Sequence, residues 1–220
     1  MFEKLTDLTF EEWVYHMFDH PEAWYFAIGS EYWDGPPEVA VEYVTRLFTD
    51  PHPHLDGYTD DELKRGFWYL LSNGGSDVMF AISDPRVPLE KRLACIETFY
   101  IVLRDFFVPR CSPHLSHLDE PGVNPLNSPC YMWWDITPVP SGASDEDQGP
   151  LTDACLSVME RTLALDSIAC QENALHGLGH WHRHFPERVE SIIDAFLAAH
   201  PDIRPELKNY ALSARGGCVQ

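Results

Sequence analysis

The sequence predicts an all-α protein, and three observations support that class. Apolar residues recur at spacings of three and four residues in one segment after another, which is the period of a helix with one buried face. Capping residues, prolines and glycines flank those segments where helices begin and end. Alternation of apolar and polar residues is scarce, so no sheet of consequence is expected. With 220 residues, 45% of them hydrophobic, the chain is long enough to form a single domain over residues 1–220.

The first half of the chain contains two strong helix starts. Thr9 and Glu12 form a Thr-x-x-Glu capping box, and Thr59 and Glu62 form a second one. In such a box each side chain accepts a hydrogen bond from the other residue's backbone N–H, which satisfies groups that a helix start otherwise leaves free. The helices expected in this half cover residues 9–20, 36–50, 59–72, 76–82 and 88–107.

The second half returns to the same pattern after a proline-rich gap. Helices are expected at residues 152–165, 167–185, 186–199 and 205–215. The gap, residues 109–150, contains eight of the eighteen prolines, which forbids a regular helix over most of its length. We interpret it as an insertion loop whose aromatic cluster at 131–134 docks onto the helices and whose acidic tip is mobile. The pattern leaves open whether this loop is a lid or a docking element.

Two short stretches near the carboxyl end repeat each other. The residues from Ala174 to Gly179 and from Ala211 to Gly216 match at alanine, leucine and glycine with an offset of 37 residues. Over residues 166–217 the chain therefore resembles HEAT-like repeats, whose helix pairs often carry small residues and a Leu-Gly element at their contact. The resemblance implies an irregular α-solenoid of stacked antiparallel helix pairs, and it implies protein binding on an extended surface.

The formal charge of −20 is concentrated in two stretches. Residues 1–62 contain fifteen acidic residues against Lys4 and Arg46, and residues 111–160 contain eight acidic residues and no lysine or arginine. Such a field repels nucleic acid and anionic membranes and attracts a basic protein. The alternative is that the acidity serves solubility alone.

The sequence also carries signals about the cellular compartment of the protein. The first residues lack a basic stretch followed by an apolar run, and no apolar stretch approaches membrane-spanning length. The six cysteines are scattered and form no Cys-x-x-Cys pair, so we expect free thiols in a reducing compartment. These patterns predict a soluble, cytoplasmic protein.

The first functional hypothesis is a protein-binding module. Its acidic surface would engage a basic protein partner, as an inhibitor or immunity-type protein does. Aromatic residues between 24 and 33 would form part of a binding patch, or they would cap the end of the helix stack. A small-molecule pocket beneath the 131–134 cluster is a further alternative. The candidate binding residues are Trp24, Tyr32, Trp33, Trp133, Trp134, Asp145, Glu146 and Asp147.

The second functional hypothesis is a metal-dependent enzyme. Four groups able to bind a metal follow one another at four-residue spacing, namely Glu172, His176, His180 and His184. This spacing stacks them along one face of the 167–185 helix, where two histidines can bind one divalent metal. The apolar residues lie on the other side, so His176 and His180 are expected to point toward solvent or a neighbouring helix.

The metal hypothesis has a plainer alternative, which is a solvated polar stripe. Glu12, His16 and His20 repeat the same spacing near the start of the chain. Gly177 takes the place of the general base in an HExxH motif, and no other catalytic motif is present. The sequence therefore leaves the question of an enzyme open, and it predicts a divalent metal only under this second hypothesis.

Overall fold

The computed structural model describes residues 4–25, 31–139 and 148–219, and these residues are mostly helical, as predicted. The α-helices are α1 (Phe10–Phe18), α2 (Glu22–Tyr25), α3 (Pro37–Thr49), α4 (His52–Leu55), α5 (Asp60–Leu71), α6 (Leu89–Val102), α7 (Asn127–Ile136), α8 (Gln148–Leu163), α9 (Ile168–Trp181), α10 (Pro186–Ala199) and α11 (Pro205–Arg215). Shorter elements are the 3-10 helices η1 (Val78–Ser83) and η3 (Ser116–Leu118) and the π-helical turn η2 (Leu103–Phe107). Two-residue strands, β1 (Lys4–Leu5) and β2 (Tyr32–Trp33), pair in parallel.

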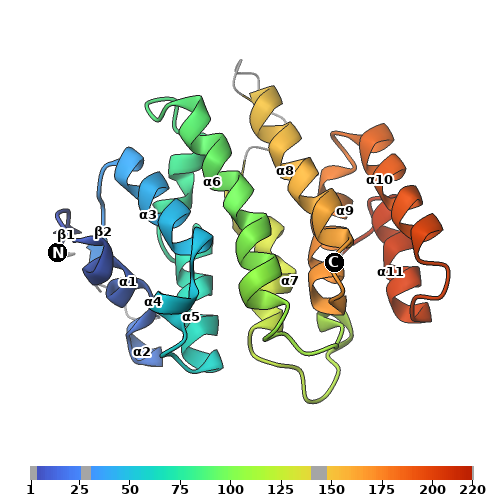
Figure 1. The fold of residues 1–220 in the computed structure, drawn as a ribbon, viewed down its shortest axis with the longest axis horizontal. Helices are drawn as coiled ribbons and strands as arrows, with labels where there is room; N and C mark the ends of the chain where they lie inside the picture. The colour runs from blue at the N-terminus through green and yellow to red at the C-terminus, as the bar shows by residue number, and fades with distance from the viewer. Residues whose placement is uncertain (1–3, 26–30, 140–147, 220) are drawn as a thin grey trace.

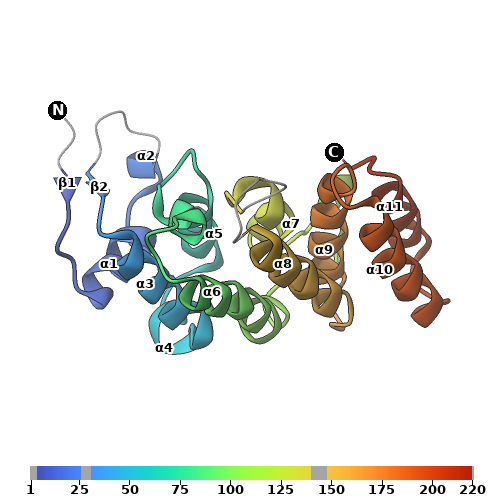
Figure 2. The same ribbon diagram turned by 90° about the horizontal axis from the view of Figure 1, so that it is seen from above.

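The helices lie side by side along the long axis of the molecule (Figure 1). Helices α3, α6 and α8 are successive neighbours in one row, and α1, α5, α7, α9 and α11 are successive neighbours in a second row. Figure 2 shows the two rows from above, with α10 and α11 closing the carboxyl-terminal end. Contacts between α8 and α9 join the rows, so α9 is enclosed between neighbours.

Local sequence signals set the helix starts as predicted. The Thr9 backbone N–H donates to Glu12 Oε2 at 2.8 Å, and the Glu12 N–H donates to Thr9 Oγ1. Thr59 and Glu62 form the same reciprocal pair, again with a 2.8 Å bond from the threonine N–H. Both capping boxes are therefore confirmed.

The prediction of a loop over residues 109–150 is wrong where α7 lies within it and where α8 begins at Gln148. Pro129 is in the first turn of α7, where a backbone N–H has no helical partner to lose. The next proline is Pro138, so the helix has room for its full length. Trp133 and Trp134 are on this helix and are buried, which makes α7 part of the core rather than a cover over a pocket.

Trp133 lies where the two rows meet. Its ring centroid is 5.5 Å from that of Phe48 on α3 and 5.4 Å from that of Phe99 on α6. Phe67 of α5 and Phe107 of η2 complete this aromatic centre. Burial of such large rings is the dominant stabilising contribution to a helical core.

Two glycines of α9 permit close contacts with neighbouring helices. A Cβ atom added to Gly177 would lie 2.6 Å from Trp134 Cγ, so α9 and α7 approach closely only because Gly177 has no side chain. A Cβ on Gly179 would lie 3.2 Å from the Cα of Ala214 in α11. Gly179 and Ala214 belong to the two matching stretches of the sequence, which therefore pack against each other.

The cysteines are free thiols, as expected from their spacing. Among the described residues no helix is long and apolar enough to cross a membrane.

Candidate functional site

Helix α9 is enclosed by other helices, so of the two expected positions His176 takes the one against neighbouring helices, whereas His180 is partly exposed to solvent. Glu172 is 0% exposed and His176 is 1% exposed, because α7, α8, α10 and α11 all contact α9. The expectation of a solvent-facing stripe assumed that polar residues mark the exposed face of a helix. That assumption fails for Glu172 and His176, whose side chains form hydrogen bonds inside the protein.

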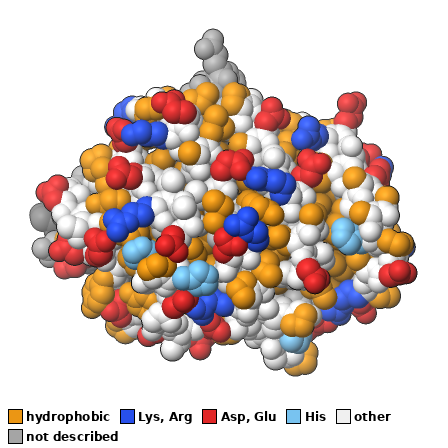
Figure 3. All heavy atoms as spheres, in the orientation of Figure 1, with side chains coloured by type: hydrophobic (Ala, Val, Ile, Leu, Met, Phe, Trp, Pro, Cys, Tyr) orange, Lys and Arg blue, Asp and Glu red, His pale blue; other side chains and the backbone are white. Residues whose placement is uncertain are grey.

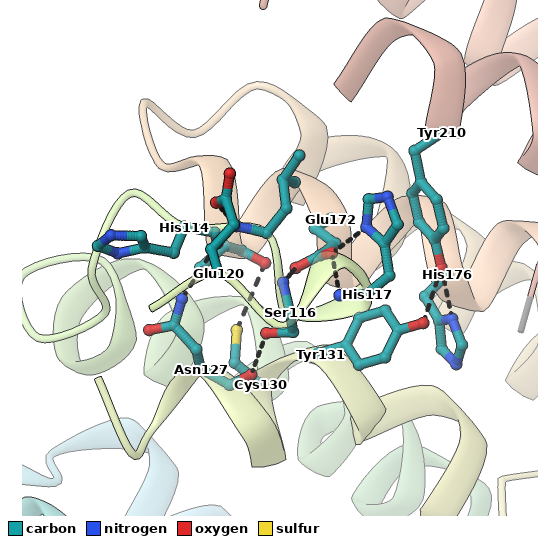
Figure 4. A network of polar contacts seen from close by, with 12 residues as sticks. His114, Ser116, His117, Glu120, Asn127, Cys130, Tyr131, Glu172, His176 and Tyr210 are labelled. Atoms are coloured by element: carbon teal, nitrogen blue, oxygen red, sulfur yellow. Dashed lines mark hydrogen bonds and ion pairs between the residues drawn. The ribbon is translucent and has the colours of Figure 1, made fainter. Parts of the chain in front are cut away.

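Glu172 anchors the segment that contains η3 to α9. Its carboxylate accepts hydrogen bonds from the backbone N–H groups of Ser116 at 2.8 Å and His117 at 3.1 Å. The Nδ1 atom of His117 lies 2.6 Å from Glu172 Oε1 and completes the set (Figure 4). A buried carboxylate requires this kind of compensation, because its desolvation is otherwise very costly.

A second group of hydrogen bonds joins α9 to α7 and α11. His176 Nδ1 lies 2.7 Å from the Tyr210 hydroxyl, which lies 3.1 Å from the Tyr131 hydroxyl (Figure 4). The His117 ring stacks on Tyr210 with centroids 4.1 Å apart, so the two groups are contiguous. Burial lowers the pKa of His176 to about 3, and it raises the pKa of Tyr210 far above its usual range. His176 is therefore a neutral imidazole at physiological pH.

The outer nitrogen of His176 faces two further groups that could bind a metal. His176 Nε2 lies 3.1 Å from His180 Nε2, and His180 Nε2 lies 3.7 Å from Asp135 Oδ1. Within the part of the chain that the structure describes, these three residues are the only group of His, Cys or acidic side chains whose ligand atoms all lie within 4.8 Å of one another. Asp135 is on α7, whereas both histidines are on α9.

The structure brings together only two of the four residues that the metal hypothesis named. His176 and His180 come together, but Glu172 is held by residues 116 and 117 and takes no part. His184 lies beyond the last residue of α9 and is exposed. Asp135 was missed, because the prolines around it hid the helix at residues 127–136 that packs beside α9.

The candidate binding residues differ widely in how much of each side chain is exposed to solvent. Tyr32 is 38% exposed and Trp24 is half-buried, stacked on His20 with ring centroids 3.6 Å apart. Trp33, Trp133 and Trp134 are buried, so they offer a partner very little exposed surface. Asp145, Glu146 and Asp147 lie outside the described residues.

The second Glu/His stripe, which begins on α1 and ends at His20 just beyond it, has a different environment. Glu12 closes the capping box, and His16 is buried, with no hydrogen-bond partner for its Nε2 atom in the described part of the chain. Burial lowers the pKa of His16 to about 4. Burial also lowers the pKa of His20. No carboxylate completes a metal-binding group with these two histidines among the described residues.

Ion pairs with basic side chains neutralise part of the acidic charge. Several arginines and one lysine bind carboxylates of other segments, for example Arg110 with Asp56 at 2.7 Å and Arg204 with Glu120 at 2.6 Å. Acidic and basic side chains are interspersed over the face in Figure 3. Residues 5–45 differ, because they contain nine acidic residues and no lysine or arginine. The acidic surplus is therefore greatest at the end of the molecule formed by α1, α2 and the start of α3.

A hollow of about 510 Å³ opens beside the α9 network. His117, Tyr131 and Tyr210 line it together with Ser213 and Cys218 of the carboxyl-terminal segment. Glu172 fixes the His117 imidazole at the wall of this hollow through its Nδ1 atom.

No protein-family model matches the chain, and the searches of curated proteins and of solved structures also find no match.

Proposed function

We propose that the chain is an irregular, HEAT-like α-solenoid that binds a basic protein through its acidic amino-terminal end. The observation that carries this proposal is the stretch of residues 5–45, with nine acidic residues and no lysine or arginine. Most of these acidic side chains are exposed, and Arg46 neutralises Glu11 through a 2.8 Å ion pair. A surface of one charge sign accelerates association with a partner of the opposite sign and disfavours nucleic acid and anionic membranes.

The arrangement of the helices supports the solenoid part of the proposal. The helices are stacked in two rows, each helix beside the next one in its row. The two stretches that repeat each other in sequence, on α9 and α11, pack together through Gly179 and Ala214. In stacked helical arrays each unit contacts mainly its neighbours, which leaves extended faces and ends for partners.

Exposed aromatic residues favour the amino-terminal one of the two acidic stretches as the binding surface. Ion pairs do not separate the stretches, because Glu38 pairs with Lys91 in the first and Glu120 pairs with Arg204 in the second. Tyr15 and Tyr32 are exposed among the acidic residues of the amino-terminal end. Exposed tyrosines beside carboxylates favour a partner that offers both positive charge and apolar surface. A cationic protein neutralised by an inhibitor or immunity-type protein has this chemistry.

The test is recovery of a partner from native lysate at increasing salt concentration. We expect a basic protein whose binding weakens steeply with salt, because exposed charges are screened over about 8–10 Å at physiological ionic strength. Failure to recover a basic protein, or binding that salt does not affect, would contradict the proposal.

Matched charge variants locate the surface. The triple variant Asp7→Asn, Asp19→Asn, Glu22→Gln removes three exposed charges from the acidic end. We expect its association rate with the recovered partner to fall by about tenfold, since the field of this end steers the encounter. The control removes three exposed charges elsewhere, through the changes Asp153→Asn, Glu187→Gln and Asp202→Asn. Equal losses in the two variants would show that only the total charge matters.

A further inference from the structure

The contact between His176, His180 and Asp135 has the composition of a transition-metal site. Two imidazole nitrogens and one carboxylate oxygen are the ligands that zinc and its neighbours prefer, whereas calcium and magnesium prefer oxygen alone. The histidines are four residues apart on α9, so their side chains share one face of the helix, and α7 supplies the carboxylate.

The separations match the dimensions of a small coordination sphere. Ligands about 2.1 Å from a tetrahedral metal lie roughly 3.4 Å from one another. The two histidine nitrogens are 3.1 Å apart, and the His180 nitrogen is 3.7 Å from the Asp135 oxygen. All three atoms fall within 4.8 Å of one another, so small side-chain rotations of Asp135 and His180 would close the set.

The buried histidine has the outer partner that metal-bound histidines usually have. His176 Nδ1 is 2.7 Å from the Tyr210 hydroxyl, and that hydroxyl has Tyr131 as a second partner at 3.1 Å. When Nδ1 carries the proton and donates to Tyr210, Nε2 presents its lone pair toward His180 and Asp135. Tyr210 then donates its own proton to Tyr131. The network therefore accommodates the tautomer that a metal needs while it keeps the hydrogen bonds of His176 and Tyr210.

We propose that Asp135, His176 and His180 bind one divalent transition metal of the zinc class. The side chains of His180 and Asp135 are 38% and 42% exposed, so an ion reaches the site from solvent, and a water molecule completes its coordination. The bound ion would tie α7 to α9 at a point where only Gly177 allows their close approach. This site is separate from the acidic end, so the metal-binding proposal does not depend on the protein-binding proposal.

The alternative is a plain hydrogen bond between two neutral imidazoles, one donating to the other. Such a pair would not require the carboxylate of Asp135 and would bind no metal specifically. The acidic chain would then bind zinc only weakly and at many places, without dependence on any one histidine.

The experiment is calorimetric titration of the metal-free full-length chain with Zn²⁺, in competition with a chelator of known affinity. We expect one equivalent to bind tightly. The changes His180→Ala and Asp135→Asn affect partly exposed side chains, so the variants should fold, and circular dichroism at the same temperature checks this. Each should weaken Zn²⁺ binding by at least the 10–100-fold that loss of an outer partner typically costs.

Two further variants distinguish this site from zinc binding elsewhere on the chain. His184→Ala removes an exposed histidine beyond the end of α9 and should leave the affinity for Zn²⁺ unchanged. Tyr210→Phe removes the outer partner of His176 and should weaken binding by about tenfold. The proposal is overturned if no saturable binding is seen, if His180→Ala binds as tightly as the unaltered chain, or if His184→Ala weakens binding as much as His180→Ala does.

Discussion

Two helices of this protein carry the same spacing of glutamate and histidine and use it differently. On α1 the residues are Glu12 and His16, with His20 at the same spacing two residues past the end of the helix, whereas Glu172, His176 and His180 all lie within α9. On α1 the glutamate is part of a capping box, and the histidines lie among aromatic rings. On α9 the glutamate holds a neighbouring segment, and the histidines join a hydrogen-bonded group.

The neighbouring helices account for this difference. The His16 ring is 5.3 Å from the Trp24 ring of α2 and 6.1 Å from the Tyr69 ring of α5, and both contacts are edge-on. α7 and α11 instead present Asp135 and hydroxyl groups toward α9. Four-residue spacing thus places side chains on one face, but the chemistry of that face depends on what packs against it.

The largest expected difference concerns the two glutamates. Glu172→Gln places an amide where a buried carboxylate accepts three hydrogen bonds, so we expect a loss of about 2–4 kcal/mol in the free energy of unfolding. Glu12→Gln changes an exposed capping residue and should cost less than about 1 kcal/mol. Urea unfolding of both variants measures the two losses. Similar losses would mean that the two stripes do not differ in the way their contacts indicate.

The next expected effect concerns the close approach of α9 to α7. Gly177→Ala should destabilise the protein by about 1–3 kcal/mol, because the new Cβ would overlap the Trp134 ring. It should also weaken Zn²⁺ binding, since Asp135 follows Trp134 on the displaced helix. Gly57→Ala is the control, because a Cβ there would meet no atom within 4 Å. If Gly177→Ala unfolds at the same urea concentration as the control, the two helices are less tightly packed than we describe.

The smallest expected effect is the contribution of His16 on α1 to the pH dependence of the free energy of unfolding. Burial holds the pKa of His16 at about 4 in the folded protein, below its usual value of 6.5. The unfolded chain therefore binds more protons between these two values, so stability falls as pH decreases through this window. With allowance for solvent screening, His16 should account for about 1–2 kcal/mol of that loss.

The variant His16→Phe tests this contribution. It removes the titrating group and keeps an aromatic ring in an aromatic site, so its free energy of unfolding should fall less than that of the unaltered chain between pH 7 and about pH 4.5. Parallel urea unfolding curves at the two pH values provide the comparison. An identical pH dependence in both proteins would show that His16 takes up no extra proton on unfolding.

Local signals made most of the helices predictable from the sequence. Both capping boxes form, and the expected helix at 88–107 corresponds to α6 with η2 as its continuation. These features depend on residues within a few positions of one another, which is why pattern alone identifies them. α7 escaped prediction because the density of prolines around it outweighed the run without proline from Cys130 to Thr137.

The candidate site was predictable only in part. The spacing of His176 and His180 is visible in the sequence, but their burial depends on α9 being enclosed by other helices, which no helical periodicity records. Asp135 is distant from both histidines in the sequence and meets them only through the packing of α7 on α9. Glu172 shares the spacing, but its carboxylate accepts hydrogen bonds from the backbone of residues 116 and 117 instead. Tertiary contacts therefore decided which members of the stripe form the site.

The most direct measurement is an anomalous difference map from crystals grown with Zn²⁺ and measured at the zinc absorption edge. One strong peak should lie between Asp135 Oδ1 and the Nε2 atoms of His176 and His180, with no comparable peak beside His16 and His20. A strong peak at the α1 stripe, or none at the α9 site, would contradict the conclusion that neighbouring helices give these two identical spacings different roles.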